Sequence, residues 1–306
     1  MIEVRLITDL KEAERFWRAL SPNQVIFDDW DFRACFYKYK PYPLRFYVAF
    51  EDGSEISEAA NEPAKAIGLL PLQFNEEWGC LEFFAEDPCE ENRVFIKPGR
   101  EEVIPQLYGA LKETAKFYDI SGEDGFTRAL AIEDNKYILP LDGLKSFTDY
   151  LATRLSPKKQ RNFRSDFRKI EELNVKVLSG RSQDLEILFD LNNKNFPDSY
   201  LETASDRQSW QALLDVPFPW EIISLEIEGK IQAVSLAVLY NNIYFYLING
   251  VNFRDYPNLG KYLNRLNIEK ALELKARYLD AGLGDCNWKI AWHFDPKPQY
   301  EFIKEV

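Results

Sequence analysis

The chain has 306 residues, of which 46% are hydrophobic and 15% aromatic, a composition typical of a folded globular protein and not of a disordered one. Its formal net charge of −12 argues against a general nucleic-acid-binding surface. No apolar stretch approaches the roughly 20 residues that span a bilayer, and the N-terminus, Met1-Ile-Glu-Val-Arg-Leu, lacks a basic segment followed by an apolar one. We therefore expect a cytoplasmic protein that does not insert into membranes.

The cysteines and the single histidine restrict the chemistry. The four cysteines are scattered without a Cys-x-x-Cys pair, which indicates neither a zinc site nor a disulfide framework, so we expect no metal. His293 is the only histidine, and a Cys286–His293 nucleophile pair would need a third, orienting group. A packed thiol and a surface imidazole are the simpler interpretation.

Alternating apolar residues in the N-terminal half predict three strands followed by a helix. The motif Lys97-Pro98-Gly99 stands at the expected start of that helix. The segment Asp52–Pro63, rich in Glu, Ser, Ala and Asn, is interpreted as a solvated insertion. The expected elements are strands at Arg45–Glu51, Ala66–Phe74 and Gly79–Phe84 and a helix at Glu101–Tyr118.

A basic helix is predicted between the two halves, over about residues 156–173. Seven of the residues from Arg154 to Lys169 are basic and one, Asp166, is acidic. Ser156-Pro157 is a good helix start. The apolar residues Phe163, Phe167 and Ile170 follow at helical spacing and leave the cationic side chains largely outside their stripe. Those cations are either a solvated face or a site for a phosphate-bearing ligand, for which Arg161 and Arg164 are our candidates.

The C-terminal half predicts the same order of elements as the N-terminal half, namely β-β-β-α-β. Two copies of one unit agree with about 150 residues per domain. We expect an N-terminal domain at residues 1–145 and a C-terminal domain at 146–306. The expected C-terminal elements are strands at Trp220–Glu228, Ile231–Tyr240 and Ile243–Asn249, a helix at Lys261–Lys275 and a strand at Arg277–Ala281.

Two glycine motifs of this half are typical of anion binding. Pro257-Asn-Leu-Gly260 opens the predicted helix, and Tyr278-Leu-Asp-Ala-Gly-Leu-Gly-Asp-Cys-Asn-Trp-Lys289 joins an apolar strand to a Gly-rich loop. Such loops present backbone N–H groups to anions. The aromatic-Lys pair Trp288-Lys289 places one positive charge just past the strand.

The double β-β-β-α-β layout, the basic helix and the closing Gly-Leu-Gly-Asp-x-x-aromatic-Lys motif resemble the GNAT-like acyltransferases of the Fem-type peptidyltransferase and BioF2-like group. The resemblance runs from about Phe27-Asp-Asp-Trp30 through Lys289. It implies an α/β (α+β) fold with two GNAT-like domains, each a mixed, mostly antiparallel central sheet flanked by helices. It also implies transfer of an acetyl, longer acyl or aminoacyl group from an acyl-CoA or a similar activated donor to an amine.

The reaction and the resemblance together indicate site residues. The oxyanion donor is expected from backbone N–H groups where Ile243–Asn249 and Arg277–Ala281 part. The resemblance gives Lys289 the role of a cation at the oxyanion or at a carboxyl or phosphate group. Asp285 either orients Lys289 or caps the loop, and Tyr246 is a candidate general acid. Residues expected to bind the donor are Asn258, Leu259, Gly260 and Lys261, with Arg161 and Arg164.

The two halves are expected to differ in role. Glu101-Glu102 at the N-terminal helix start would repel a phosphate, so we assign the donor to the C-terminal half and an acceptor-shaping role to the other half. The alternatives are a non-catalytic ligand- or partner-binding protein on the same fold, and a Fem-type peptidyltransferase that uses aminoacyl-tRNA. The sequence leaves the identity of the acceptor, a small molecule or a peptide amine, and the oligomeric state open.

Overall fold

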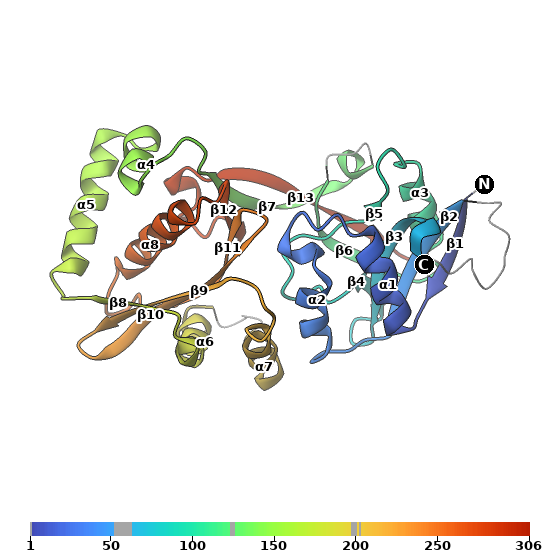
Figure 1. Ribbon diagram of the computed structural model, residues 1–306, viewed down its shortest axis with the longest axis horizontal. Coiled ribbons are helices and arrows are strands. Elements are labelled where there is room, and N and C mark those ends of the chain that lie inside the picture. Colours follow the sequence, from blue (N-terminus) through green and yellow to red (C-terminus); the bar gives the residue numbers. More distant parts are fainter. Residues whose placement is uncertain (1, 52–62, 123–125, 197–200, 202) are drawn as a thin grey trace. The chain divides into compact units, whose positions relative to one another are not determined.

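The computed structural model describes residues 2–51, 63–122, 126–196, 201 and 203–306 (Figure 1). The chain forms two compact units: unit 1 contains residues 1–134 and 298–306, and unit 2 contains residues 135–297. It passes from unit 1 to unit 2 within strand β7 (Ala131–Pro140) and returns within strand β13 (Asp295–Lys304). This division differs from the sequence-based boundary between 145 and 146. It falls within a strand, and residues 298–306 belong with the N-terminal unit.

Unit 1 is built on a sheet with the strand order β1-β2-β3-β4-β6-β13, in which β4 and β6 are parallel and the other neighbours are antiparallel. The short β5 pairs with β3. A Cβ atom at Gly68 would lie 2.6 Å from Val103, so this glycine allows α3 to lie close to β3. The elements are β1 (Ile2–Ile7), α1 (Leu10–Leu20), α2 (Trp30–Tyr37), β2 (Leu44–Glu51), β3 (Ala66–Asn75), β4 (Cys80–Phe83), β5 (Phe95–Ile96), α3 (Val103–Gly109) and β6 (Ala115–Ile120).

Unit 2 has the strand order β7-β12-β11-β10-β9-β8, and β11 and β12 are its parallel pair. Helices α4, α5 and α8 share one hydrophobic core with the sheet. Its elements are α4 (Phe147–Arg154), α5 (Pro157–Glu171), β8 (Lys176–Ser179), α6 (Leu185–Asn195), α7 (Ala204–Leu213), β9 (Trp220–Ile227), β10 (Lys230–Tyr240), β11 (Ile243–Val251), α8 (Leu259–Glu273) and β12 (Tyr278–Leu283).

Helices α6 and α8 cover opposite faces of the unit 2 sheet. Val251 of β11 is buried in the core that α8 shares, whereas its neighbour Gly250 lies against α6. Successive residues of a strand point to opposite faces, so the two helices enclose β11 from both sides. Figure 1 shows α6 and α8 on the two sides of β11.

The predicted basic helix is confirmed as α5. The Ser156 hydroxyl accepts a hydrogen bond from the N–H of Lys159, and Phe163, Phe167 and Ile170 are its buried residues. The β-β-β-α-β order predicted for the C-terminal half is also confirmed. Within the described part of the chain, no helix combines the length and apolar character that membrane crossing requires.

The predicted helix at Glu101–Tyr118 is confirmed in its first part, as α3, and is wrong in its second part. Helix α3 ends at Gly109, and residues 115–120 form β6, which closes the N-terminal repeat. Ala115 and Phe117 are buried while Lys116 between them is not, which is the two-residue period of a strand. Pairing with β4 on one side and β13 on the other stabilises that extended segment. The predicted insertion at Asp52–Pro63 lies outside the described residues except for Pro63.

Candidate functional site

The parting of strands β11 and β12 is the central feature of unit 2. These parallel strands pair at three positions only, from Ile243 to Phe245 on β11, and Phe245 lies opposite Asp280. Just beyond this point β11 bulges at Leu247, which has no partner in the register with β10. The backbone of β11 past Phe245 is therefore not used in pairing with β12. This is the location at which the sequence predicts backbone donors for an oxyanion.

Helix α6 covers β11 in this diverging stretch. A Cβ atom added to Gly250 would lie 2.2 Å from a backbone carbonyl oxygen of α6, so the helix lies directly on the strand. The side-chain amide of Asn192 donates to the carbonyl of Asn249 (2.7 Å), and that of Asn195 donates to the carbonyl of Val251 (2.8 Å). Two asparagines thus satisfy β11 carbonyls where β12 no longer pairs with the strand.

The first turn of α8 holds the residues predicted to bind the donor. Asn258 stands at the N-cap position and makes no side-chain capping bond, and Leu259 is fully buried. A Cβ atom at Gly260 would lie 2.5 Å from the ring of Phe253. A side chain at this position would displace the ring of Phe253, which is 42% exposed, whether or not a ligand approaches it.

Lys261 is held by helix α5. Its ammonium lies 2.7 Å from the carboxylate of Asp166. Arg265, one turn further along α8, pairs with Glu171 of α5 at 2.9 Å. Ion pairs therefore join α5 to the start of α8, and the charge of Lys261 has a counter-charge within unit 2.

Lys289 is a buried cation, with 4% of its surface exposed. Its ammonium donates to the carbonyls of Gly282 (3.0 Å) and Leu283 (2.5 Å) and lies over the ring of Tyr137. The sequence-based alternative of an exposed loop lysine is therefore wrong. The contacts give Lys289 the structural role of fixing the end of β12, and the predicted role at an oxyanion stays a prediction.

Asp285 caps the turn that carries Lys289. Its carboxylate accepts a hydrogen bond from the backbone N–H of Ile290 (2.7 Å), and its carbonyl accepts from the N–H of Trp288 and of Lys289. This geometry matches the loop-cap alternative that the sequence left open.

A buried ion pair lies at the point of divergence, and the sequence analysis missed it. Lys136 of β7 and Asp280 of β12 are 2.6 Å apart with side chains 4% and 3% exposed. The Asp280 carboxylate also accepts from the N–H of Gly282 (3.0 Å). The sequence signal for this pair is a charged residue, Asp280, inside an apolar strand, because burying a charge without a partner is costly.

Tyr246 faces helix α8. Its hydroxyl donates to the side-chain carbonyl of Asn264 (3.2 Å), and burial raises its pKa. The neighbouring Tyr244 donates to Asn267 (2.9 Å), and burial raises its pKa as well. A raised pKa makes a phenol a weaker acid, so these contacts favour a structural role for Tyr246 over the predicted general acid.

The two arginines predicted to bind phosphate, Arg161 and Arg164, are exposed on α5. The start of this helix also contacts the turn after Lys289. The ammonium of Lys159 donates to the carbonyl of Ala291 (2.9 Å), and the ring of Phe163 lies 4.7 Å from that of Trp292. Helix α5 therefore contacts both the start of α8 and the 285–293 turn.

Strands β4 and β6 of unit 1 also part, and a side chain of the same unit fills the place. They pair at Leu81 and Ala115. The carboxylate of Glu86 then accepts hydrogen bonds from the backbone N–H of Phe83 (3.0 Å) and of Tyr118 (3.3 Å). Burial raises the pKa of the Glu86 carboxyl well above its ordinary value. In unit 1 these backbone donors are thus occupied by the unit's own side chain.

The described residues contain no group of three or more His, Cys, Asp or Glu side chains able to hold a metal ion. Cys286 and His293 are both exposed, and Cys80 and Cys89 are buried thiols. Burial raises the pKa of Cys89 to about 12, which keeps this thiol protonated.

Comparisons with known proteins agree with this geometry. Residues 157–290 match the model of the acetyltransferase (GNAT) domain family. The matched segment runs from the start of α5 past β12, so it contains the parting strands and the helices on both faces. A comparison with curated proteins finds no match.

Three solved structures illustrate the similarity of the whole chain. FemX has a TM-score of 0.58 at 12% identity, with 99% of this chain and 97% of that chain covered. L-PGS from Bacillus licheniformis has 0.57 at 11%, with 96% and 91% covered. A tandem GNAT protein from the clavulanic acid biosynthesis pathway has 0.52 at 11%, with 99% and 98% covered. At these identities the likeness shows the fold, and the predicted double GNAT-like α/β fold is confirmed.

Proposed function

We propose that this chain, whose residues 157–290 match the acetyltransferase (GNAT) domain family, is an N-acyltransferase with its acyl donor in unit 2. The observation that carries the proposal is the parallel pair β11 and β12, which stops pairing after Phe245 within the matched domain. Backbone N–H groups of β11 beyond that point are suited to the oxyanion that forms during acyl transfer.

The proposed donor is an acyl thioester such as an acyl-CoA, and the acceptor is a small-molecule or peptide amine. The neutral amine nitrogen attacks the acyl carbonyl carbon, and the oxyanion accepts hydrogen bonds from backbone N–H groups. The thiolate then leaves as the carbonyl reforms, and the extra proton of the amine nitrogen passes to the departing thiolate, directly or through water, so that the products are an amide and a free thiol. No side chain has to form a covalent bond in this sequence.

Unit 2 is the preferred location because the equivalent place in unit 1 is occupied. Glu86 accepts hydrogen bonds from the N–H groups of Phe83 and Tyr118 there. A second anion at the same donors would be repelled by that carboxyl whenever it is ionised. Repulsion by Glu86 is therefore a second argument, besides Glu101-Glu102 at the helix start, for assigning the donor to unit 2 and not to unit 1.

Ligand binding tests the donor. Acetyl-CoA, longer acyl-CoAs and free CoA are titrated while the melting temperature is followed, and a saturable rise is expected because ligands stabilise the folded state by mass action. Asn258→Asp is the diagnostic variant, since Asp is as good an N-cap as Asn but adds a negative charge where the donor phosphates would lie. We expect its affinity to fall by about tenfold or more, a loss of roughly 1.4 kcal/mol. The exposed Asn23→Asp is the matched control.

Gly260→Glu is a poorer test, because any side chain at this position displaces Phe253. Release of free thiol in the presence of a panel of amines then measures transfer. Stabilisation by acyl-CoA without transfer would favour the alternative of a non-catalytic binding protein. Absence of stabilisation by every thioester would contradict the thioester donor.

The exposed cations of α5 favour one second candidate, in which the donor is an aminoacyl-tRNA. Arg161, Arg164 and Arg168 are exposed at helical spacing on one side of α5, opposite to its buried residues. A triple Arg→Gln variant should abolish salt-dependent binding of aminoacyl-tRNA, because phosphate contacts dominate nucleic-acid affinity. Equal binding of tRNA by the variant and the unaltered protein would contradict this candidate.

A further inference from the structure

Unit 1 contains a cavity of about 210 Å³ that no part of the proposed reaction uses. It is bordered by the segment that connects α1 to the 3-10 turn Ile26–Asp28, by the segment that contains β5, by α3 and by the end of β6. Apolar side chains that line it are Phe95, Ile96, Ile104, Ile120 and Phe126. Polar side chains that line it are Gln24, Arg93, Tyr108, Ser121 and Thr127.

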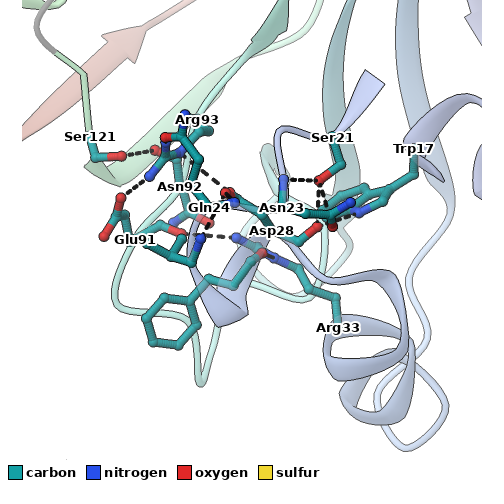
Figure 2. A network of polar contacts seen from close by, with 12 residues as sticks. Trp17, Ser21, Asn23, Gln24, Asp28, Arg33, Glu91, Asn92, Arg93 and Ser121 are labelled. Carbon is teal, nitrogen blue, oxygen red and sulfur yellow. Dashed lines mark hydrogen bonds and ion pairs between the residues drawn. The ribbon is translucent and has the colours of Figure 1, made fainter. Parts of the chain in front are cut away.

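Arg93 is fixed in place at the cavity. Its Nη1 donates to the side-chain carbonyl of Gln24 (3.1 Å), and its Nη2 pairs with the carboxylate of Glu91. Its Nε lies 3.3 Å from the carboxylate of Asp28. Figure 2 shows Arg93 beside these three residues and Ser121. The guanidinium is therefore oriented before any ligand arrives.

The support behind Arg93 is a rigid network of buried polar groups. Asp28 is 1% exposed, and its carboxylate accepts hydrogen bonds from the backbone N–H groups of Gln24 and Val25. Arg33, 3% exposed, donates to the backbone carbonyls of three separate segments. Figure 2 shows this network joining the segment after α1 to the segment that contains Glu91 and Arg93. Burying these charges is costly, and their function in this network is to orient one cation, Arg93, at the cavity.

The chemistry of the lining selects the ligand. Arg93 is the only charged side chain among the lining residues that the structure describes, and no carboxylate is one of them. Burial raises the pKa of Asp28, and the charge of Arg93 acts in the opposite direction. The volume equals about seven water molecules at roughly 30 Å³ each. An apolar wall beside a fixed guanidinium and hydroxyl groups suits a small molecule with a hydrocarbon body and an anionic head.

We propose that this cavity binds a short-chain monocarboxylate, with its carboxylate on Arg93 and its hydrocarbon chain against Phe95, Ile104 and Ile120. The site is independent of the proposed acyl transfer, because it lies wholly within unit 1 and uses none of the unit 2 residues named for that reaction. Binding of the monocarboxylate therefore tests this proposal, and the presence or absence of acyl transfer does not affect it.

Calorimetric titration of the full chain tests the proposal, with pentanoate as the probe. Pentanamide has the same size without the charge, and pentylamine has the opposite charge. The expected result is saturable binding of one pentanoate per chain, at least about tenfold tighter than either analogue. No saturation by pentanoate, or equal or tighter binding of pentanamide or pentylamine, would overturn the proposal.

Variants assign the binding to the cavity. Ser121→Leu fills the space without touching the ion pairs, and it should weaken pentanoate at least about tenfold. The double variant Arg93→Gln with Glu91→Gln removes the guanidinium together with its principal partner and should abolish the preference for pentanoate over pentanamide. Arg15→Gln, an exposed arginine of α1, is the matched control and should change nothing. Unaltered binding in Ser121→Leu would place the ligand elsewhere and overturn the assignment, even if the double variant does not fold.

Discussion

At the scale of single residues, Lys289 is a buried charge satisfied by backbone carbonyls. Lys289→Met keeps the volume of the side chain but leaves the carbonyls of Gly282 and Leu283 without the ammonium. We expect this variant to lower the free energy of unfolding by about 2 kcal/mol, because buried polar groups that lose a charged partner keep their desolvation cost. Urea denaturation measures the change.

Lys297→Met serves as the control, since that lysine is exposed and lies in the same unit. If Lys289→Met had normal stability but a strongly reduced rate of acyl transfer, the structural role would be wrong. The predicted catalytic role of Lys289 would then be supported instead.

Glu86 makes the stability of the protein depend on pH in a specific direction. Burial raises the pKa of its carboxyl well above the ordinary value of 4.5. A raised pKa in the folded state means that folding favours the protonated form, so the stabilising contribution is complete below pH 4.5 and is lost as pH rises through the folded-state pKa. Relative to Glu86→Gln, the unaltered protein should lose stability between mildly acidic and mildly alkaline pH.

The measurement is the difference in unfolding free energy between the protein and Glu86→Gln at a series of pH values. Other carboxyl groups titrate in both proteins and cancel in this difference. A difference that stays constant with pH for Glu86→Gln would contradict the raised pKa.

At the scale of elements, the close contact between α6 and β11 depends on the absence of a side chain at Gly250. A Cβ at Gly250 would lie 2.2 Å from the carbonyl oxygen of Leu188 and 2.9 Å from Leu191. Gly250→Ala should therefore push α6 off the strand and cost about 1–3 kcal/mol, the usual range for overpacking. The bonds from Asn192 and Asn195 to β11 should weaken at the same time, which hydrogen exchange of α6 detects.

Gly109→Ala is the matched control, because nothing lies within 4 Å of a Cβ added there. Alanine at such a position costs little and often stabilises a helix. Equal effects of the two variants would show that the loss of backbone freedom, and not the steric contact with α6, determines the result.

The same elements show which parts of the structure the sequence could predict. Helical spacing predicted α5, which buries one stripe of residues, and the apolar segments bounded by turns predicted the strands β9, β10 and β11. Such patterns failed at residues 115–120, where pairing with β4 and β13 stabilises a strand that the local sequence does not demand.

The elements around the candidate site were predictable, and the contacts of its residues were not. The motifs at 257–260 and 278–289 indicated the correct ends of α8 and β12. The roles of Gly260 and Lys289 depend on Phe253 and on the carbonyls of Gly282 and Leu283, which are tertiary contacts. The Lys136–Asp280 pair joins strands far apart in sequence, so no local pattern specifies it.

At the scale of the whole molecule, the two units share one fold but differ in which backbone groups their own side chains bind at the point where the parallel strands part. Each unit has a pair of parallel strands, β4 and β6 or β11 and β12, that parts soon after it forms. In unit 1 the backbone donors beside that pair bind the Glu86 carboxylate. In unit 2 the side-chain amides of Asn192 and Asn195 on α6 donate to carbonyls of β11. The difference favours a reaction in unit 2 and a different task, ligand binding, in unit 1.

The return of the chain to unit 1 predicts the effect of a truncation. Strand β13 pairs with β6 from Tyr300 to Lys304, and the ring of Phe302 stacks on that of Phe117 at 5.5 Å. Removing residues 298–306 exposes the edge of β6 and removes this ring from the core. Deleting a fully buried phenylalanine costs about 3–5 kcal/mol. Phe302 is half-buried and contributes part of that range, and the strand pairing is lost with it, so unit 1 should unfold at a lower urea concentration than unit 2.

Hydrogen exchange resolved by peptide separates the two units in this experiment. Peptides from α3 and β6 should lose protection in the 1–297 chain, while peptides from α8 and β10 keep it, since those elements lie in unit 2. A 1–304 chain, which lacks only the two residues after β13, is the control and should behave like the full chain. Equal loss of protection in both units would mean that they unfold as one cooperative body, and the separate stability of unit 2 would be wrong. Retained protection of β6 in the 1–297 chain would mean that the strand is stable on β4 alone, against the expectation that an uncovered apolar edge is unstable.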